Sequence, residues 1–133
     1  MDKDSFLARV GEYHKGGWRL ALINATTVLA ADEATPGVFE VTWAFAKELE
    51  FETIRETIGQ ADAVPSVSEF FGAAFLYENE IRELFGINVT GLGLDLKGQL
   101  YKTATKIPFS HSAIRARIEA AAAAAAAATV KKA

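Results

Sequence analysis

The stretch 64–87 (VPSVSEFFGAAFLYENEIRELFGI) carries the clearest helix start and stop signals in the chain. Ser66 is followed three residues later by Glu69, the spacing of a capping box, in which each side chain accepts a hydrogen bond from the other residue's backbone N–H. Gly86 stands at the far end, where glycine readily takes the left-handed conformation that closes a helix. These signals predict one helix of about six turns. Gly72 is the one position that could divide it into a single turn and a longer helix.

Two faces of this predicted helix carry apolar side chains. At the helical spacing, one face is expected to pack on a core: Phe70, Ala74, Tyr77, Ile81, Leu84 and Phe85. A second group lies roughly opposite: Phe71, Phe75, Glu78 and Arg82. Glu78 and Arg82 have the spacing of a favourable ion pair, while Glu80 and Glu83 are expected to be solvated. Because a helix that is apolar on two faces is usually covered on both, the second face predicts a further contact.

The beginning of the chain predicts a helix followed by a strand. Asp4 or Ser5 is expected to cap a first helix, which ends at Gly16 and Gly17. Residues 18–27 (WRLALINATT) are rich in apolar and β-branched residues, a composition typical of a strand. The sequence therefore starts with an α-β pair.

The clearest strand signal is the strict alternation of apolar residues over 39–45. Leu49 and Phe51 continue this pattern in a third strand, but Ile54 and Ile58 fall on the opposite parity, which predicts a bulge or a helical turn there. Three consecutive strands with helices on one face indicate an α+β fold: an N-terminal helix, a three-stranded antiparallel meander and a long helix packed on the sheet.

The chain becomes less regular after the long helix. Glycines punctuate residues 88–109, in which 100–101 is a candidate for a short strand. Residues 110–133 form an Ala-rich tail. A short alanine helix with little to bury is marginal alone, so the tail is expected to be a frayed helix or a helix docked on a partner. We therefore expect an α+β domain over 1–109, ending in an extended segment, and a separate tail.

Composition limits the classes of function. The chain has 133 residues, with 14 Lys and Arg against 17 Asp and Glu, and a formal net charge of −3. This balance argues against nucleic acid or an anionic lipid surface as the main partner. The absence of cysteine excludes disulfides, thiolate-held zinc and iron–sulfur clusters within this chain. Neither an apolar signal segment nor a run of about 18 apolar residues is present, so a cytoplasmic protein is expected.

The sequence offers little for catalysis or metal binding. His14 and His111 lie far apart with no further ligand cluster, so each is expected to be a surface histidine and no metal site is expected. Glu78, Glu80 and Glu83 are the densest carboxylates, but Glu78 points away from the other two on the helical wheel. A free-standing enzyme, as an alternative function, would use Glu78 or Glu80 as its base.

The central stretch also resembles a known signature. PSVSEFF, YENEIRELFGI and the later Asp95-Leu96-Lys97 are similar to the motif of the C-subunit family of the proton-pumping NADH:quinone oxidoreductases (respiratory complex I). The same family includes the homologous subunit of membrane-bound, energy-converting nickel–iron hydrogenases. The matching positions are Pro65, Ser66, Val67, Glu78, Glu80, Glu83, Phe85, Gly86, Ile87 and Gly91.

The chain departs from the family pattern at several positions. Asn79 stands where an arginine is usual, and Arg82 stands where an aromatic residue is usual. Residues 92–94 (LGL) replace a His-Pro element, and Lys97 stands in for an arginine. The loss of His-Pro and the short chain favour the hydrogenase branch.

The resemblance implies an accessory oxidoreductase subunit that binds no cofactor. It would lie in the hydrophilic arm, between a hydrogenase-like catalytic large subunit and an iron–sulfur small subunit, which carry the nickel–iron site and the clusters. Its position would be peripheral, on the inner face of the cell membrane, with membrane contact only through the complex and no nucleic acid partner. The expected partner interface consists of Phe71, Phe75, Glu78, Arg82, Asp95 and Lys97.

Two further hypotheses remain besides an energy-converting hydrogenase subunit. Within the same family, the chain would be the C-subunit of an NADH:quinone oxidoreductase. Outside it, the chain would be the small enzyme described above, or a homo-oligomer that buries Phe71 and Phe75 against their own copies.

Overall fold

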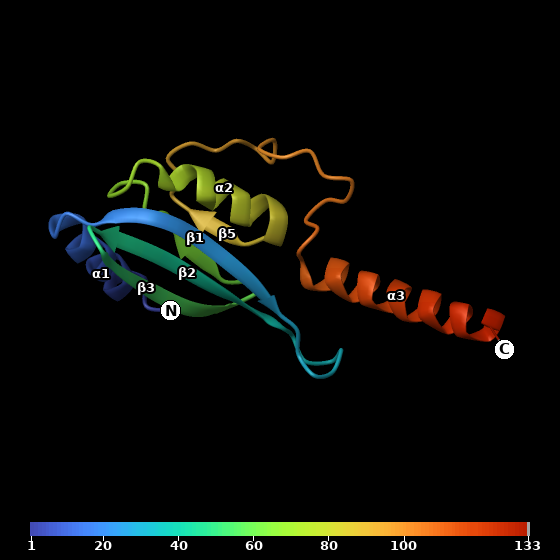
Figure 1. Cartoon of the computed structure of the whole chain (residues 1–133). Coiled ribbons are helices and arrows are strands. Elements are labelled where there is room, and N and C mark those ends of the chain that lie inside the picture. The colour runs from blue at the N-terminus through green and yellow to red at the C-terminus, as the bar shows by residue number, and fades with distance from the viewer. Residues whose placement is uncertain (133) are drawn as a thin grey trace.

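The protein has the α+β fold that the sequence predicts. The computed structural model describes residues 1–132, with the side chains of residues 1–128. In chain order the elements are α1 (Lys3–Lys15), β1 (Arg19–Val28), β2 (Val38–Lys47), β3 (Glu50–Gly59), β4 (Ala63–Pro65), α2 (Ala74–Phe85), β5 (Asn88–Thr90) and α3 (His111–Lys132). Figure 1 shows α1 and α2 against the three-stranded sheet, while α3 projects away from it.

The first three strands form the expected antiparallel meander, with β2 in the centre. The alternation in β2 places its large apolar side chains on one buried face: Phe39, Val41, Trp43 and Phe45. Trp43 lies opposite Ile23 of β1 and Ile54 of β3, so the centre of the core is formed by all three strands.

The third strand pairs with β2 without a shift in register, so the predicted bulge or helical turn there is wrong. Ile54 and Ile58 are buried on the core face, whereas Phe51 lies on the other face and is exposed. The change in parity therefore marks a switch between the two faces of a regular strand. The register shift of this sheet occurs in β1, between Leu20 and Leu22.

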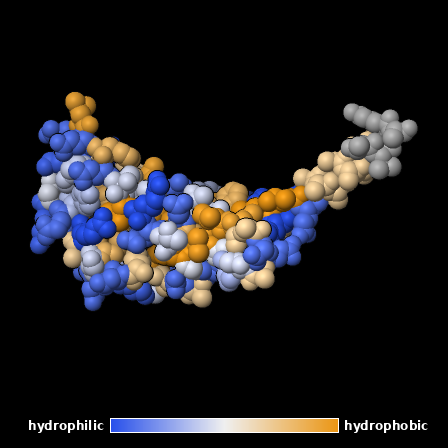
Figure 2. Space-filling model, turned by 90° about the horizontal axis from the view of Figure 1, so that it is seen from below, coloured by the Kyte–Doolittle hydropathy of each residue, from blue (hydrophilic) through white to orange (hydrophobic). Residues whose placement is uncertain are grey.

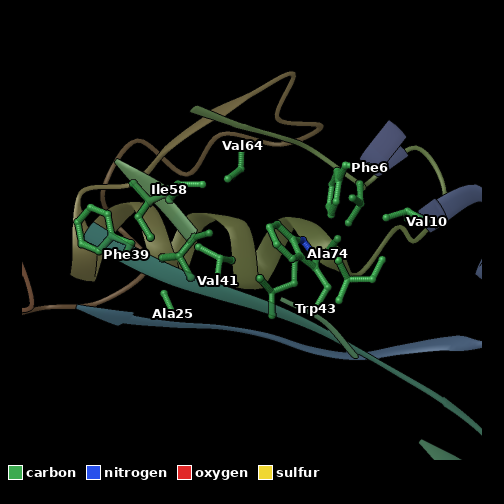
Figure 3. Close-up of a cluster of buried hydrophobic side chains, with 14 of the residues drawn as sticks. Phe6, Val10, Ala25, Phe39, Val41, Trp43, Ile58, Val64 and Ala74 are labelled. Atoms are coloured by element: carbon green, nitrogen blue, oxygen red, sulfur yellow. The ribbon is translucent and has the colours of Figure 1, made fainter. Parts of the chain in front are cut away.

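Both α1 and α2 pack on the same face of the sheet (Figure 3). The Phe6 ring of α1 lies 4.5 Å from the Trp43 ring, and Tyr13 stacks on Phe45 with 4.2 Å between ring centroids. Ala74 of α2 is buried in the same cluster. One continuous core thus joins the N-terminal helix, the sheet and the central helix.

The N-cap of the first helix lies earlier in the chain than expected. The Asp2 side chain accepts a hydrogen bond from the backbone N–H of Asp4, so Asp2 is the N-cap rather than Asp4 or Ser5. The helix ends at Lys15 with Gly16 as its C-cap, as predicted.

The predicted long helix over 64–87 is divided, which confirms the alternative that Gly72 left open. The backbone N–H of Phe71 donates to the Val67 carbonyl in a single turn, and α2 begins only at Ala74. The start of the predicted helix is instead the short strand β4, paired in parallel with β5. No strand forms at 100–101.

The predicted capping box is wrong. Ala73 is the N-cap of α2 and makes no side-chain hydrogen bond there. The Ser66 hydroxyl accepts from the backbone N–H of Ser68 and donates to Glu78, and it makes no hydrogen bond with Glu69. Ser66 therefore links the turn to α2 rather than starting a helix.

Residues 91–110 run back over α2 without regular secondary structure and lead into α3 (Figure 1). The start of α3 is fastened to the end of the β1–β2 hairpin. The buried His111 has its Nε2 atom 2.9 Å from the Val38 carbonyl oxygen, and Arg115 donates to the Ala30 carbonyl at 3.0 Å.

The rest of α3 carries the alanine run, whose residues 120–128 are exposed. The Ala-rich tail is thus a helix whose beginning is bound to the chain's own β1–β2 hairpin, and docking on a partner stays a prediction. Ala133, the last residue of the tail, lies outside the described residues. No helix in the described part of the chain is both long and apolar enough to cross a bilayer.

Candidate partner-binding surface around helix α2

One side of α2 packs on the sheet as the helical wheel predicts. Ala74 and Ile81 are buried, and Tyr77 packs against the core with its hydroxyl donating to the Ala21 carbonyl at 3.0 Å. Gly86 has a φ of 79° and closes the helix in the left-handed conformation, also as predicted.

Glu78 lies inside the protein, and fastens the turn before α2 to the helix. It is only 2 % exposed. Its carboxylate accepts hydrogen bonds from the Ser66 hydroxyl and from the backbone N–H of Val67, both at 2.7 Å. Burial raises the pKa of Glu78, while these two hydrogen bonds act in the opposite direction. The expectation that Glu78 stands on an exposed face, paired with Arg82, is therefore wrong.

Asn79 is the other buried polar residue of α2, at 1 % exposed. Its amide nitrogen donates to the carbonyls of Phe75 and Leu94, at 2.7 and 2.8 Å. Its amide oxygen accepts the backbone N–H of Leu96 at 3.0 Å. This side chain therefore holds the irregular segment against the helix. The sequence marked Asn79 only as a departure from the family pattern, and no periodicity identified its partners.

The two glutamates that were expected to be solvated also bind this segment. The Glu83 carboxylate accepts the backbone N–H groups of Leu100 and Tyr101, at 2.9 and 3.1 Å. Glu80 accepts the Tyr101 hydroxyl at 2.8 Å, and this contact raises the pKa of the tyrosine. The outer side of α2 is thus covered by its own chain. We call residues 94–107 the covering segment.

Three of the predicted interface residues lie together at the edge of the covering segment: Arg82, Asp95 and Lys97. The Arg82 guanidinium lies 2.6 Å from the Asp95 carboxylate, which also accepts the backbone N–H of Lys97 at 2.7 Å. The Lys97 hydrogen bond, followed by the Arg82 contact, lowers the pKa of Asp95. Because both side chains of the ion pair are substantially exposed, the pair shapes the surface more than it stabilises the fold.

The two phenylalanines of the predicted interface do not join this group. Phe71 is half-buried near α1 and β2, with its ring 5.7 Å from the Phe45 ring and 5.5 Å from the His14 ring. Phe75 is half-buried on α2, where its carbonyl accepts from Asn79. Neither residue is freely exposed, contrary to the helical wheel.

Exposed apolar side chains occur instead on α2 and on the chain that covers it: Leu76, Leu94, Tyr101, Ile107 and Phe109. Sequence reasoning missed the four of these residues that follow α2, because that segment has no periodicity. Figure 2 shows a second face, where hydrophobic residues form a band between hydrophilic ones that runs toward the base of α3. Exposed apolar surface that is rimmed by polar residues is typical of protein–protein contacts.

The two histidines differ in their surroundings. His111 is 7 % exposed and packs its ring 4.7 Å from the Phe39 ring, so the expectation of a surface histidine is wrong for it. His14 is exposed, as expected. Within the described residues, no group of three or more His, Asp or Glu side chains is arranged to hold a metal.

These features define a small α+β domain whose central helix uses its buried and half-buried polar side chains to hold its own covering segment. A comparison of the sequence with protein families identifies the family to which this domain belongs. Residues 6–112 match the family described as respiratory-chain NADH dehydrogenase, 30 Kd subunit, and the chain belongs to this family. A search of the curated proteins found no match.

Family membership confirms the resemblance seen in the central stretch. It makes the chain a subunit of a complex I-like oxidoreductase, an assembly of several subunits. The matched residues include the whole sheet, α2 and the covering segment, and end at the start of α3. The relation to hydrogenases remains a prediction.

Proposed function

We propose that this chain is a non-catalytic structural subunit in the hydrophilic arm of a membrane-bound energy-converting hydrogenase. There it bridges the catalytic large subunit and the iron–sulfur small subunit. The nickel–iron site and the iron–sulfur clusters belong to those partners, and this chain binds no cofactor. It is held at the inner face of the cell membrane only through the complex.

The observation that carries this proposal is the covered helix within a chain of this family. On α2 the carboxylates of Glu78 and Glu83 and the amide of Asn79 are all engaged by the chain's own backbone. The solvent-facing surface on this side of the domain combines exposed apolar residues with the Arg82–Asp95 ion pair. Aromatic side chains and arginine are common anchors in protein interfaces.

The branch of the family is the finer part of the proposal. Residues 92–94 (LGL) in place of a His-Pro element favour the hydrogenase branch. The alternative is the C-subunit of an NADH:quinone oxidoreductase, which fits the matched family equally well. The two differ in the large subunit that purifies together with the chain, which is nickel-binding in the first case and quinone-binding in the second.

The competing enzyme hypothesis relies on carboxylates that already have partners within the chain. Glu78 is buried, and its carboxylate already accepts hydrogen bonds from its own chain. Glu80 accepts a hydrogen bond from the Tyr101 hydroxyl. A general base must instead reach a proton of the substrate. Turnover by the purified chain alone, lost in Glu80→Gln, would support the enzyme and contradict the structural role.

The structural role is tested by binding of purified variants to the large subunit of the complex. Arg82→Ala is expected to weaken binding by about tenfold, the effect of losing an interface anchor, while the domain stays folded. Arg55→Ala is the matched control, because Arg55 is also an exposed arginine near a carboxylate, Glu40, but lies on the sheet. Equal binding by both variants and the wild type would contradict the proposed interface.

A further inference from the structure

A pocket of about 310 Å³ lies between the C-terminal half of α2 and the covering segment. Its lining residues come from both: Arg82, Glu83, Lys97, Gly98, Tyr101, Thr103, Lys106 and Ile107. Three of these side chains are cationic and one is a carboxylate, in a chain whose formal net charge is −3. The pocket is therefore a local concentration of positive charge on an acidic protein.

The charges of this pocket are not neutralised equally. The Glu83 carboxylate accepts two backbone N–H groups of the covering segment, and the Arg82 guanidinium is paired with Asp95. Among the described residues, neither Lys97 nor Lys106 has a side-chain hydrogen bond or an ion-pair partner. The Lys97 ammonium group interacts with Asp95 only at longer range, without an ion-pair contact, so it and that of Lys106 remain available to an anion that enters from outside.

The apolar part of the lining indicates what kind of anion fits. Tyr101 and Ile107 line the same pocket, and both are exposed large side chains. A bare inorganic anion would leave this apolar surface in water, whereas an Asp or Glu side chain with an apolar neighbour would cover it. The volume also exceeds what one small ion needs.

We infer that this pocket receives an acidic segment of the partner large subunit, with its carboxylates next to Lys97 and Lys106. The inference rests on the proposed function and specifies the chemistry of the partner. Charge complementarity of this type steers association and orients the partner, so its contribution falls as salt increases. This inference adds Lys106 to the predicted interface. No motif or periodicity in the sequence pointed to this residue.

The pairing is tested by treating the complex of wild-type chain and large subunit with a zero-length carbodiimide, which joins carboxylates to amines that are in contact. Peptide mapping is expected to find Lys97 or Lys106 joined to Asp or Glu of the large subunit. Lys102 is the matched control, since it is an exposed lysine of the same segment that does not line the pocket. Cross-links at Lys102 without any at Lys97 and Lys106 would overturn the inference.

Charge reversal gives an independent readout of the same pocket. Lys97→Glu and Lys106→Glu are each expected to weaken binding of the large subunit about fivefold or more at low salt, whereas Lys102→Glu changes it less than about twofold. If the wild type binds the large subunit and none of the three variants changes that binding, the inferred role of the pocket is overturned. The structural role is then unaffected. No binding by the wild type would overturn the structural role, and with it the assigned occupant.

Inorganic phosphate serves as the probe for the small-anion alternative. We expect the backbone amide resonances of the pocket in the isolated chain to show no saturable shift with phosphate. A saturable shift that Lys106→Glu abolishes would identify a small-anion site and overturn the inference of an acidic protein segment.

Discussion

The amide oxygen of Asn79 accepts the backbone N–H of Leu96 at 3.0 Å, from a side chain that is 1 % exposed. This contact shows how the protein orders a segment that has no secondary structure of its own. Backbone groups that no helix or strand satisfies are instead satisfied by polar side chains of α2. A partner that docks here meets the covering segment in a fixed conformation, which lowers the entropic cost of binding.

Replacing Asn79 should destabilise the fold. Asn79→Ala leaves the Leu96 N–H and the Leu94 carbonyl without their partner, so we expect the free energy of unfolding to fall by about 2–3 kcal/mol. Urea denaturation measures this change. Asn24→Ala is the control, because Asn24 is exposed on β1, and it should alter stability by less than about 0.5 kcal/mol. Equal effects of the two substitutions would show that Asn79 does not hold the segment.

Glu83 should control the mobility of the covering segment. Glu83→Ala removes the acceptor of two backbone N–H groups, so the amides of Leu100 and Tyr101 should exchange with solvent about tenfold faster. Hydrogen exchange followed by NMR resolves these amides. Glu80→Gln serves as the comparison, since Glu80 accepts the Tyr101 hydroxyl rather than a backbone N–H, and its loss should leave the exchange of Leu100 unchanged. Unchanged exchange in Glu83→Ala would contradict the role of this carboxylate.

Glu78 should make stability depend on pH in a defined direction. Burial raises the pKa of Glu78 in the folded protein above its ordinary value of 4.5. Over the window from that value up to the raised pKa, the folded protein holds a proton that the unfolded chain has lost. The stability that this group contributes is therefore fully present below the ordinary value, and is lost as the pH rises through the folded pKa.

The substitution Glu78→Gln isolates this dependence, because glutamine does not ionise. Relative to wild type, the free energy of unfolding of the variant should increase as the pH rises above 4.5. Parallel urea titrations at several pH values measure the difference. A wild type that gains stability over the variant with rising pH would mean that the folded pKa is lowered, contrary to the effect of burial.

Gly37 should be required for docking of the last helix. A Cβ atom at this position would lie 2.5 Å from the Val28 carbonyl oxygen and would also meet the His111 ring. Since backbone cannot move as easily as a side-chain end, Gly37→Ala should lower the free energy of unfolding by about 1–3 kcal/mol. The matched change is Gly72→Ala, where a Cβ meets nothing within 4 Å, and stability should stay within about 0.5 kcal/mol. Thermal denaturation of the two variants compares them directly, and a Gly37→Ala variant as stable as wild type would contradict the close approach.

Local signals in the sequence were sufficient for the order of the three meander strands and for the C-terminal ends of α1 and α2. The alternation in β2 and the glycine after Phe85 need no information from distant residues, and both predictions are confirmed. The capping box failed for a tertiary reason. The Glu78 carboxylate, twelve residues away in the chain, is brought to Ser66 and takes the hydroxyl that would have capped a helix.

The candidate surface was less accessible to prediction. The helical wheel assumed that every α2 side chain outside the core face meets solvent or a partner. The covering segment violates that assumption, because it occupies the space over Asn79 and Glu83 and has no periodicity that would reveal it. The structure does bring Arg82, Asp95 and Lys97 together, and their role in a partner interface stays a prediction.

The central claim, that this chain joins the two redox subunits of its complex, is tested most directly by native mass spectrometry of the three co-expressed proteins. We predict an assembly with one copy each of this chain, the large subunit and the iron–sulfur small subunit, and much weaker association of the other two when this chain is omitted. Full association of the large and small subunits without this chain, or a chain that stays alone in the presence of both, would contradict it.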